Sequence, residues 1–167
     1  MPKSMQEISI EPLTKAGFSA YGDVVETSGS AAIPINQGFA TRFNDLANID
    51  VTAGGASVNV SVFVAKARSS SIRVELMERH PLGTQLFIPL QDKPWLVLVC
   101  ADPQVPETFR AFRASGRQGV NYARNVWHHP LLVLEDGDRF LVIDRIGPGN
   151  NLDEVRLDER HRICVKP

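Results

Sequence analysis

The residues best suited to chemistry in this chain are Glu78 and His80, which follow a strand pattern in SIRVELMERHPLGTQ. Ile72, Val74 and Leu76 recur at every second position, as residues on one face of a β-strand do. This apolar face continues into Glu78 and His80, although burying an unpaired charge is costly. Two interpretations follow. Either the strand ends there and both side chains reach water, or they line a pocket. Burial in such a pocket shifts a pKa by up to about 3–5 units, into the range for proton transfer at neutral pH.

A second group of candidates lies in GVNYARNVWHHP, where His128 and His129 are adjacent. Neighbouring strand residues point to opposite faces, so only one of these two histidines can face the same cavity. The pattern alone does not decide which one it is. Tyr122 and Trp127 belong to the same stretch and are candidates for substrate contact, although aromatic residues at such positions more often pack in a core.

Arginine becomes relevant if the ligand is an acid, because a guanidinium group binds a carboxylate through two parallel N–H bonds. Arg42, in GFATRFNDLA, lies in a polar segment and is the candidate for this contact. Asp144 and Arg145 end an apolar strand, where they form either a structural ion pair or part of a site. His161, in DERHR, is expected on the solvated surface. The sequence contains no GxSxG, GxGxxG, HExxH or P-loop motif.

Strand signals dominate among the elements that must position these residues. ASVNVSVFVAK has the pattern of a half-buried strand, with alternate valines from Val58 to Val64 on one face and Asn59 and Ser61 on the other. Asp136 and Gly137 predict a hairpin between the two strands that flank them. The other predicted strands cover residues 84–90, 95–100, 129–135, 139–145 and 154–158.

Helix signals are few. Residues 14–22 predict a short helix with Thr14 as N-cap, and Pro106 to Gly116 predict another. Many short strands with little helix predict an all-β fold, either a closed barrel or a two-sheet jelly roll.

The strands in WLVLVC and PLLVLE are apolar on both faces. Their outer face must therefore be covered by the N-terminal segment or by another subunit.

Length and composition restrict the class of protein. The 167 residues predict one domain over residues 1–167, and the net charge of −1 offers no basic surface for nucleic acid or anionic lipid. Cys100 and Cys164 form no CxxC pair, so we expect buried thiols in a reducing compartment, with a disulfide or a reactive thiol as alternatives. The N-terminus lacks the apolar segment of a signal peptide, and the longest apolar run is too short to cross a membrane. We therefore expect a cytoplasmic protein.

Four motifs together closely resemble the ureidoglycolate lyase family: SAYGDVVE, MERHPLGTQLFIPL, GVNYARNVWHHPL and FLVIDR, in this order. The similarity runs from about Gly17 to Asn151, and ERHPLGTQ and WHHPL are specific as a pair. The resemblance implies a cupin-like jelly-roll β-barrel, commonly paired as a homodimer. It also implies cleavage of ureidoglycolate to glyoxylate and urea in purine and allantoin catabolism. A divalent metal such as nickel is sometimes associated with the family.

The cupin metal-binding pattern, carried over by this resemblance, assigns ligand positions. Glu78 and His80 stand where a cupin has two histidines, Gln85 stands at the position of its glutamate, and His128 closes the second motif. His80 and His128 are thus the suggested metal ligands with Glu78 as a third, whereas an amide such as Gln85 is a weak donor to a transition metal. A metal-free acid–base site formed by Glu78, His80 and His128 is the alternative.

The resemblance also suggests substrate contacts. Gln85 would bind the ureido group and Arg42 the carboxylate, while Asn44 occupies a position where some relatives carry histidine. Ala123 likewise replaces a polar residue found in some relatives. Two other functions stay open at this point: a metal-dependent cupin oxygenase or isomerase acting on another small acid, and a non-catalytic domain that binds a small acid.

Overall fold

Strands make up nearly all the regular structure of the chain, as the sequence predicts. The computed structural model describes residues 5–158 and 163–167, in which the single α-helix is α1 (Lys15–Phe18). Thr14 caps this helix as predicted, because its Oγ1 accepts a hydrogen bond from the Gly17 amide at 3.0 Å. Three short 3₁₀ turns complete the helical structure of the described residues: η1 (Asn36–Gly38), η2 (Ala53–Gly55) and η3 (Pro106–Thr108).

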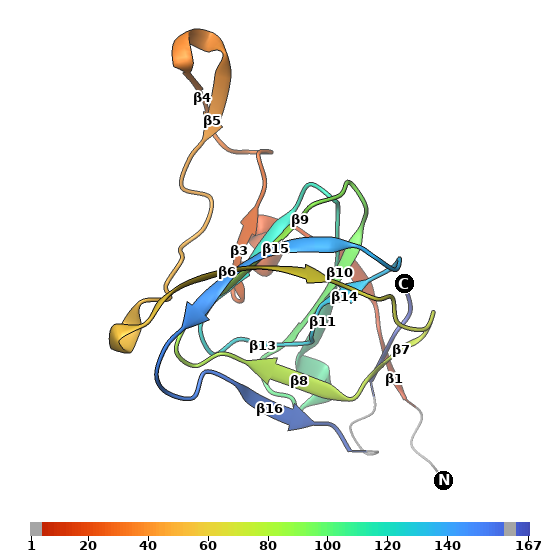
Figure 1. Cartoon of the computed structure of the whole chain (residues 1–167). Helices are drawn as coiled ribbons and strands as arrows, with labels where there is room; N and C mark the ends of the chain where they lie inside the picture. Colours follow the sequence, from red (N-terminus) through yellow and green to blue (C-terminus); the bar gives the residue numbers. More distant parts are fainter. Residues whose placement is uncertain (1–4, 159–162) are drawn as a thin grey trace.

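Two large sheets form the body of the molecule (Figure 1). The first is antiparallel, in the order β3 (Gly22–Val25), β12 (Gly119–Tyr122), β9 (Gln85–Pro89), β15 (Arg139–Ile146) and β6 (Ser57–Val64). The second has the order β16 (Asp153–Arg156), β8 (Leu76–Arg79), β13 (Trp127–His128), β10 (Trp95–Cys100), β11 (Phe109–Ala114) and β2 (Ile10–Pro12), and β14 (Leu132–Val133) also pairs with β10.

The inner faces of these two sheets share one apolar core. Phe87, Tyr122 and Phe140 enter it from the five-stranded sheet, and Trp95 and Phe112 from the seven-stranded sheet. Trp95 and Phe140 meet edge to face, with ring centroids 4.9 Å apart. The sheets therefore pack face to face, which confirms the predicted all-β fold.

A third, smaller sheet covers the outer face of β10. It has the order β1 (Gln6–Ile8), β17 (Ile163–Val165) and β7 (Ile72–Val74). Leu96, Leu98 and Cys100 of β10 pack against this sheet in a second apolar cluster. The N-terminal segment thus covers the doubly apolar strand as predicted, together with a strand from the other end of the chain.

Three predictions about local structure are wrong. The strand predicted from Ile72 to His80 is two strands, β7 and β8, which belong to different sheets. The predicted helix from Pro106 to Gly116 is the turn η3 followed by strand β11. The apolar positions of FRAFRA suit either period, and pairing with all six residues of β10 decides for the strand. The Asp136-Gly137 turn forms, with Gly137 at φ +86°, but it does not make a hairpin. Strand β14 before it pairs with β10, whereas β15 after it pairs with β6 and β9 of the other sheet.

Strand β6 alternates as predicted, but its valine face points outward and its polar face inward. Its four alternate valines, Val58 to Val64, are 47% to 68% exposed, while Asn59 and Ser61 face the space between the sheets. β6 is also the last strand of its sheet, so one edge is free.

A hairpin of β4 (Ala32–Ile35) and β5 (Ala40–Phe43) projects away from the body of the molecule (Figure 1). Phe39 at its tip is 89% exposed. Within the described residues, no helix is long and apolar enough to cross a membrane.

Candidate active site

Glu78, His80 and His128 come together on the inner side of the seven-stranded sheet. One ligand atom from each lies within 4.8 Å of the others. Strand pairing explains this arrangement, because Glu78 on β8 lies directly opposite His128 on β13. Met77 packs into the outer cluster, so Glu78 points inward, and His80 follows just beyond the end of β8. The inward face of β8 therefore leads into this group of ionisable side chains.

The register of β13 determines which of the adjacent histidines joins this group. His128 lies opposite Val99, whose side chain faces the inner core, and its ring centroid is 5.2 Å from that of His80. Glu78 Oε1 lies 3.5 Å from His128 Nε2. His129 is buried outside the group and its Nδ1 bonds to the Pro130 carbonyl oxygen at 2.7 Å. Burial is the main cause that lowers the pKa of His129 to about 4.

Backbone carbonyl oxygens fix the orientation of both histidine rings. The Nδ1 of His80 lies 2.8 Å from the Asn151 carbonyl oxygen, and the Nδ1 of His128 lies 2.9 Å from that of Val126. A carbonyl oxygen only accepts, so each Nδ1 carries a proton and donates it. Each Nε2 is then directed toward the group. The Nε2 of His128 is buried and has no hydrogen-bond partner among the described residues.

The two predicted aromatic contacts come from different sheets, Tyr122 from β12 of the five-stranded sheet and Trp127 from β13 of the seven-stranded sheet. Tyr122 stacks on His128, with ring centroids 4.1 Å apart and an interplanar angle of 10°. Trp127 points the other way and packs against the outer cluster, where the Arg79 guanidinium lies 4.5 Å from its ring centroid. Tyr122 therefore supports the His128 ring, whereas Trp127 does not reach the group.

Gln85 and Asp144 extend the polar group toward the five-stranded sheet. Gln85 Oε1 lies 3.0 Å from His80 Nε2, and Gln85 Nε2 donates to Asp144 Oδ2 at 3.2 Å. Asp144 Oδ1 accepts a hydrogen bond from Asn59 at 2.9 Å. Arg145 has a different role: its guanidinium group donates to the carbonyl oxygens of Ala53 and Pro148. Among the described residues Asp144 and Arg145 form no ion pair with each other: Asp144 bonds to Gln85 beside the group, and Arg145 bonds to backbone carbonyl oxygens.

A pocket of about 550 Å³ opens beside Glu78. Apart from Glu78, its lining comes from residues 63–68 and from Phe87, Pro130 and Leu131. Two cationic residues of this lining, Lys66 and Arg68, were missed from the sequence. The only signal there was the pair of basic residues in AKARSS, directly after the valine strand.

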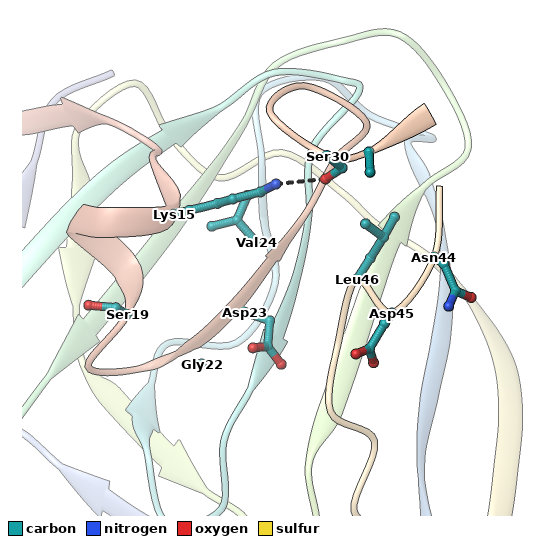
Figure 2. A pocket seen from close by; sticks show the side chains of 10 residues that line it. Lys15, Ser19, Gly22, Asp23, Val24, Ser30, Asn44, Asp45 and Leu46 are labelled. Carbon is teal, nitrogen blue, oxygen red and sulfur yellow. Dashed lines mark hydrogen bonds between the residues drawn. The ribbon is translucent and has the colours of Figure 1, made fainter. Parts of the chain in front are cut away.

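Arg42 and Asn44 do not join this group within one chain. Arg42 is exposed on β5 of the projecting hairpin (Figure 1). Asn44 borders a separate pocket of about 440 Å³ at the base of the hairpin, together with Asp23 and Asp45 (Figure 2). Neither residue lines the pocket beside Glu78.

The separate pocket in Figure 2 carries charged groups that are already bonded within the chain. The Lys15 amino group donates to Ser30 Oγ at 2.9 Å. Asp23 Oδ2 accepts hydrogen bonds from the Asn48 amide at 2.9 Å and from the Asn121 side chain at 3.0 Å. These contacts hold the base of the hairpin against β3. His161, predicted on the surface, lies outside the described residues.

Comparison with known proteins gives the family. The family model described as Ureidoglycolate lyase matches residues 5–164. The chain belongs to the ureidoglycolate lyase family. It is 47% identical over 165 residues to a Stutzerimonas stutzeri protein named ureidoglycolate lyase, which covers 98% of this chain and 97% of the relative. A Burkholderia mallei protein of that name is 49% identical over 156 residues, covering 93% and 92%, and a Pseudomonas putida one is 46% identical over 165 residues, covering 98% and 99%.

The electrostatics of the group in this family member favour an ionised carboxylate. Burial raises the pKa of Glu78, but the interactions with the imidazoles of His128 and His80 outweigh burial and leave the pKa below its ordinary value. Burial, followed by the charge of Glu78, raises the pKa of Tyr122 far above its ordinary value. At neutral pH Glu78 is therefore an anion and Tyr122 a neutral phenol.

The same donor set could hold a divalent metal ion. It offers one carboxylate oxygen and two imidazole nitrogens within 4.8 Å of one another. Metal-binding histidines typically donate their other ring N–H to a carbonyl or carboxylate, as His80 and His128 do here. The buried Nε2 of His128, which has no hydrogen-bond partner in the described part of the chain, is the observation that best fits a cation at this position.

Proposed function

We propose that this family member is a lyase that cleaves ureidoglycolate to glyoxylate and urea in the catabolism of purine-derived ureides such as allantoin. The support from relatives is the name ureidoglycolate lyase, carried by proteins 46% to 49% identical to this chain. The observation that carries the proposal is the convergence of Glu78, His80 and His128 beside a pocket. A carboxylate with two imidazoles supplies the proton acceptor and the proton donor that this cleavage needs.

The chemistry is an elimination that consumes no water. The central carbon of ureidoglycolate carries a hydroxyl group, a carboxylate and a ureido nitrogen. When the hydroxyl group loses its proton, its C–O bond becomes the carbonyl of glyoxylate. The C–N bond breaks, and its electron pair goes to the nitrogen, which takes up a proton to give urea. Each positioned acid or base contributes about 10²- to 10⁴-fold in rate.

The protein groups can be assigned to these two proton transfers. Glu78 is the proposed base, because it is the carboxylate of the group and borders the pocket. Its pKa is lowered, not raised toward neutral pH as the sequence suggested, so it is ionised but is a weaker proton acceptor than an ordinary glutamate. His128 is the alternative base, since its Nε2 is directed into the same space and has no other hydrogen-bond partner among the described residues. His80 is the proposed donor to the departing nitrogen, held in place by the Asn151 carbonyl and Gln85.

The substrate contacts follow from the pocket. We assign the carboxylate to Lys66 and Arg68, which line the pocket beside Glu78, in place of Arg42. Gln85 is the proposed partner of the ureido group, because its carbonyl oxygen has a second lone pair that can accept a ureido N–H. Arg42 and Asn44 keep a role in substrate binding only if a second copy of the chain brings them to the site.

A metal-bound form of the site is the alternative to these acid–base roles: Glu78, His80 and His128 would then be the ligands of a divalent metal, with nickel the metal that the family resemblance implies. These residues would hold the cation, and the chemistry it would supply is Lewis acidity, which lowers the pKa of a hydroxyl group. We expect elemental analysis of protein purified without chelator to find about one equivalent of metal. Dialysis against EDTA should then lower activity, and added Ni²⁺ should restore it. Full activity of the metal-free protein would instead favour acid–base catalysis by Glu78 and the histidines alone.

We further propose a cytoplasmic homodimer. The exposed valine face of β6 and the apolar tip of the projecting hairpin belong to the same chain, so two copies can cover both surfaces by symmetry. An isolated two-stranded hairpin is only marginally stable in water, which also favours a partner for it. Cys100 and Cys164 are free, buried thiols, as expected in a reducing compartment.

The direct test of the proposed function is incubation of the purified protein with ureidoglycolate, followed by separate assays for urea, glyoxylate and ammonia. We expect urea and glyoxylate in equal amounts. Release of ammonia would indicate hydrolysis of the ureido group and would contradict the lyase assignment. Binding of ureidoglycolate without any product would contradict enzymatic function altogether.

A further inference from the structure

We infer that Asp144 is a positioning residue that fixes the polarity of the Gln85 amide. It holds the Gln85 NH₂ group away from the site, so that the carbonyl oxygen faces His80. The inference deepens the proposed function, on which its kinetic consequence rests. The residue alternation of β15 alone left open whether Asp144 serves the site or a structural ion pair.

The direction of two hydrogen bonds determines the amide orientation. An ionised carboxylate only accepts, so whichever Gln85 atom faces Asp144 must be the NH₂ group. The Asp144 carboxylate is occupied on both oxygens, with Asn59 Nδ2 at 2.9 Å from Oδ1 and Gln85 Nε2 at 3.2 Å from Oδ2. Gln85 is 6% exposed, so water does not readily offer an alternative partner. Its carbonyl oxygen is thereby left 3.0 Å from His80 Nε2.

The consequence is that His80 lies between two carbonyl oxygens. The Asn151 carbonyl faces Nδ1 at 2.8 Å, and Gln85 Oε1 faces Nε2 at 3.0 Å. A carbonyl oxygen attracts an N–H group or a cation and repels another lone pair. The orientation set by Asp144 therefore suits a donating ring, a bound cation or a ureido N–H at this point. A reversed amide would present its own N–H groups there.

The orientation of strand β6 bears on the same role. Asn59 lies directly opposite Asp144 in the pairing of β6 with β15. Placing Asn59 and Asp144 inside leaves four valines on the outer face, 47% to 68% exposed in the single chain. Hydrophobic burial alone would favour the reverse arrangement, and such departures from the local pattern are expected at functional sites. Because the valine face is also the one proposed for the homodimer, the support for Asp144 comes from its direct pairing and hydrogen bond with Asn59.

The test moves the carboxylate from position 144 to position 59 by exchanging the two side chains. In Asp144→Asn the new amide can turn either way together with Asn59, so the orientation of Gln85 is no longer fixed. In the double variant Asn59→Asp with Asp144→Asn, the carboxylate at position 59 accepts from the amide at 144, whose oxygen must then accept from Gln85. We expect kcat/KM to fall about tenfold in Asp144→Asn and to return to within about threefold of wild type in the double variant.

Asp23→Asn is the matched control, because Asp23 also accepts a hydrogen bond from an asparagine side chain, that of Asn121 at 3.0 Å, but lies outside the site. We expect it to leave kcat/KM unchanged. Thermal melting of all variants identifies any that fail to fold. Asp144→Asn with wild-type kcat/KM would overturn the inference, as would a folded double variant that is no more active than Asp144→Asn.

A readout independent of activity separates this inference from the proposed function. In protein with ¹⁵N-labelled histidine, the His80 Nε2 resonance should shift in Asp144→Asn and return toward its wild-type position in the double variant. An unchanged resonance in Asp144→Asn would contradict the inference even if the enzyme is active. If the wild type releases no urea, the proposed function fails, and the resonance still decides the role of Asp144.

Discussion

His128 and His129 are neighbours in sequence, yet their surroundings give them opposite properties. His128 Nε2 lies 3.5 Å from Glu78 Oε1 and makes no hydrogen bond within residues 5–158 and 163–167, which suits proton transfer or metal binding. His129 is 4% exposed and bonds to a backbone carbonyl, which suits a neutral structural residue. The alternation of a strand separates the two rings, and the pairing of His128 with Glu78 assigns the roles.

At the residue scale, His129 makes the fold sensitive to acid. Its folded pKa is about 4, against 6.5 ordinarily, so between these values the unfolded chain binds a proton that the folded chain does not. The contribution of His129 to the free energy of unfolding is therefore fully present above pH 6.5. It falls by up to about 3 kcal/mol as the pH decreases toward 4. We expect His129→Gln to show a flatter free energy of unfolding over this range in urea titrations. Parallel wild-type and variant curves would contradict this role.

At the scale of elements, the alternation within β8 places Leu76 and Glu78 on the inward face, opposite Met77. The single strand predicted over residues 72–80 was wrong, because the chain passes from one sheet to another at Glu75, and Ile72 and Val74 pack in the outer cluster. The helix expected from Pro106 failed because FRAFRA fits both periods and its partner strand is not visible locally. The valine strand was predicted with the right alternation, but nothing in its own sequence shows that Asp144 will hold Asn59 inside. Long-range pairing thus accounts for these errors.

Segment 65–68, directly after β6, determines how the pocket meets a charged substrate. Arg42 was chosen from the sequence because its surroundings are polar, but polarity does not reveal that a hairpin carries it away from the site. Lys66 and Arg68 reach the pocket because β6 ends beside Glu78. Their basic side chains complement a carboxylate at the mouth of the pocket.

We expect Arg68→Ala to raise KM for ureidoglycolate about tenfold with little change in kcat, since it removes a charge-assisted contact made in both ground and transition states. Arg117→Ala is the control, because Arg117 is an exposed arginine that pairs with Asp92 elsewhere on the surface. Steady-state kinetics measure both variants. An unchanged KM in Arg68→Ala would show that another residue binds the substrate carboxylate. An equal rise of KM in Arg117→Ala would indicate a nonspecific charge effect.

At the scale of the whole molecule, the two ends of the chain complete the core by covering the outer face of β10 with β1 and β17. The valine face of β6 has no such cover in the single chain. A free strand edge with an apolar face is a common site of association between copies. This surface and the projecting hairpin together form the basis for the proposed homodimer.

Val60→Lys tests the dimer, because a lysine buried between two apolar faces is costly, whereas on an exposed strand of a monomer it is tolerated. We expect wild type to elute as a dimer in size-exclusion chromatography with light scattering and Val60→Lys to shift toward monomer. Val105→Lys, at an exposed valine in a loop of the other sheet, should remain dimeric. A monomeric wild type, or a dimeric Val60→Lys variant, would place the interface elsewhere.

The turnover of Glu78→Gln tests the central assignment most directly, because the amide keeps the shape of the side chain but cannot accept the hydroxyl proton. Glu75→Gln, at an exposed glutamate three residues earlier, is the matched control. We expect kcat for urea release to fall at least about 100-fold in Glu78→Gln, with wild-type folding, and to stay unchanged in Glu75→Gln. A folded Glu78→Gln enzyme with kcat within about threefold of wild type would contradict the assignment of Glu78 as the base.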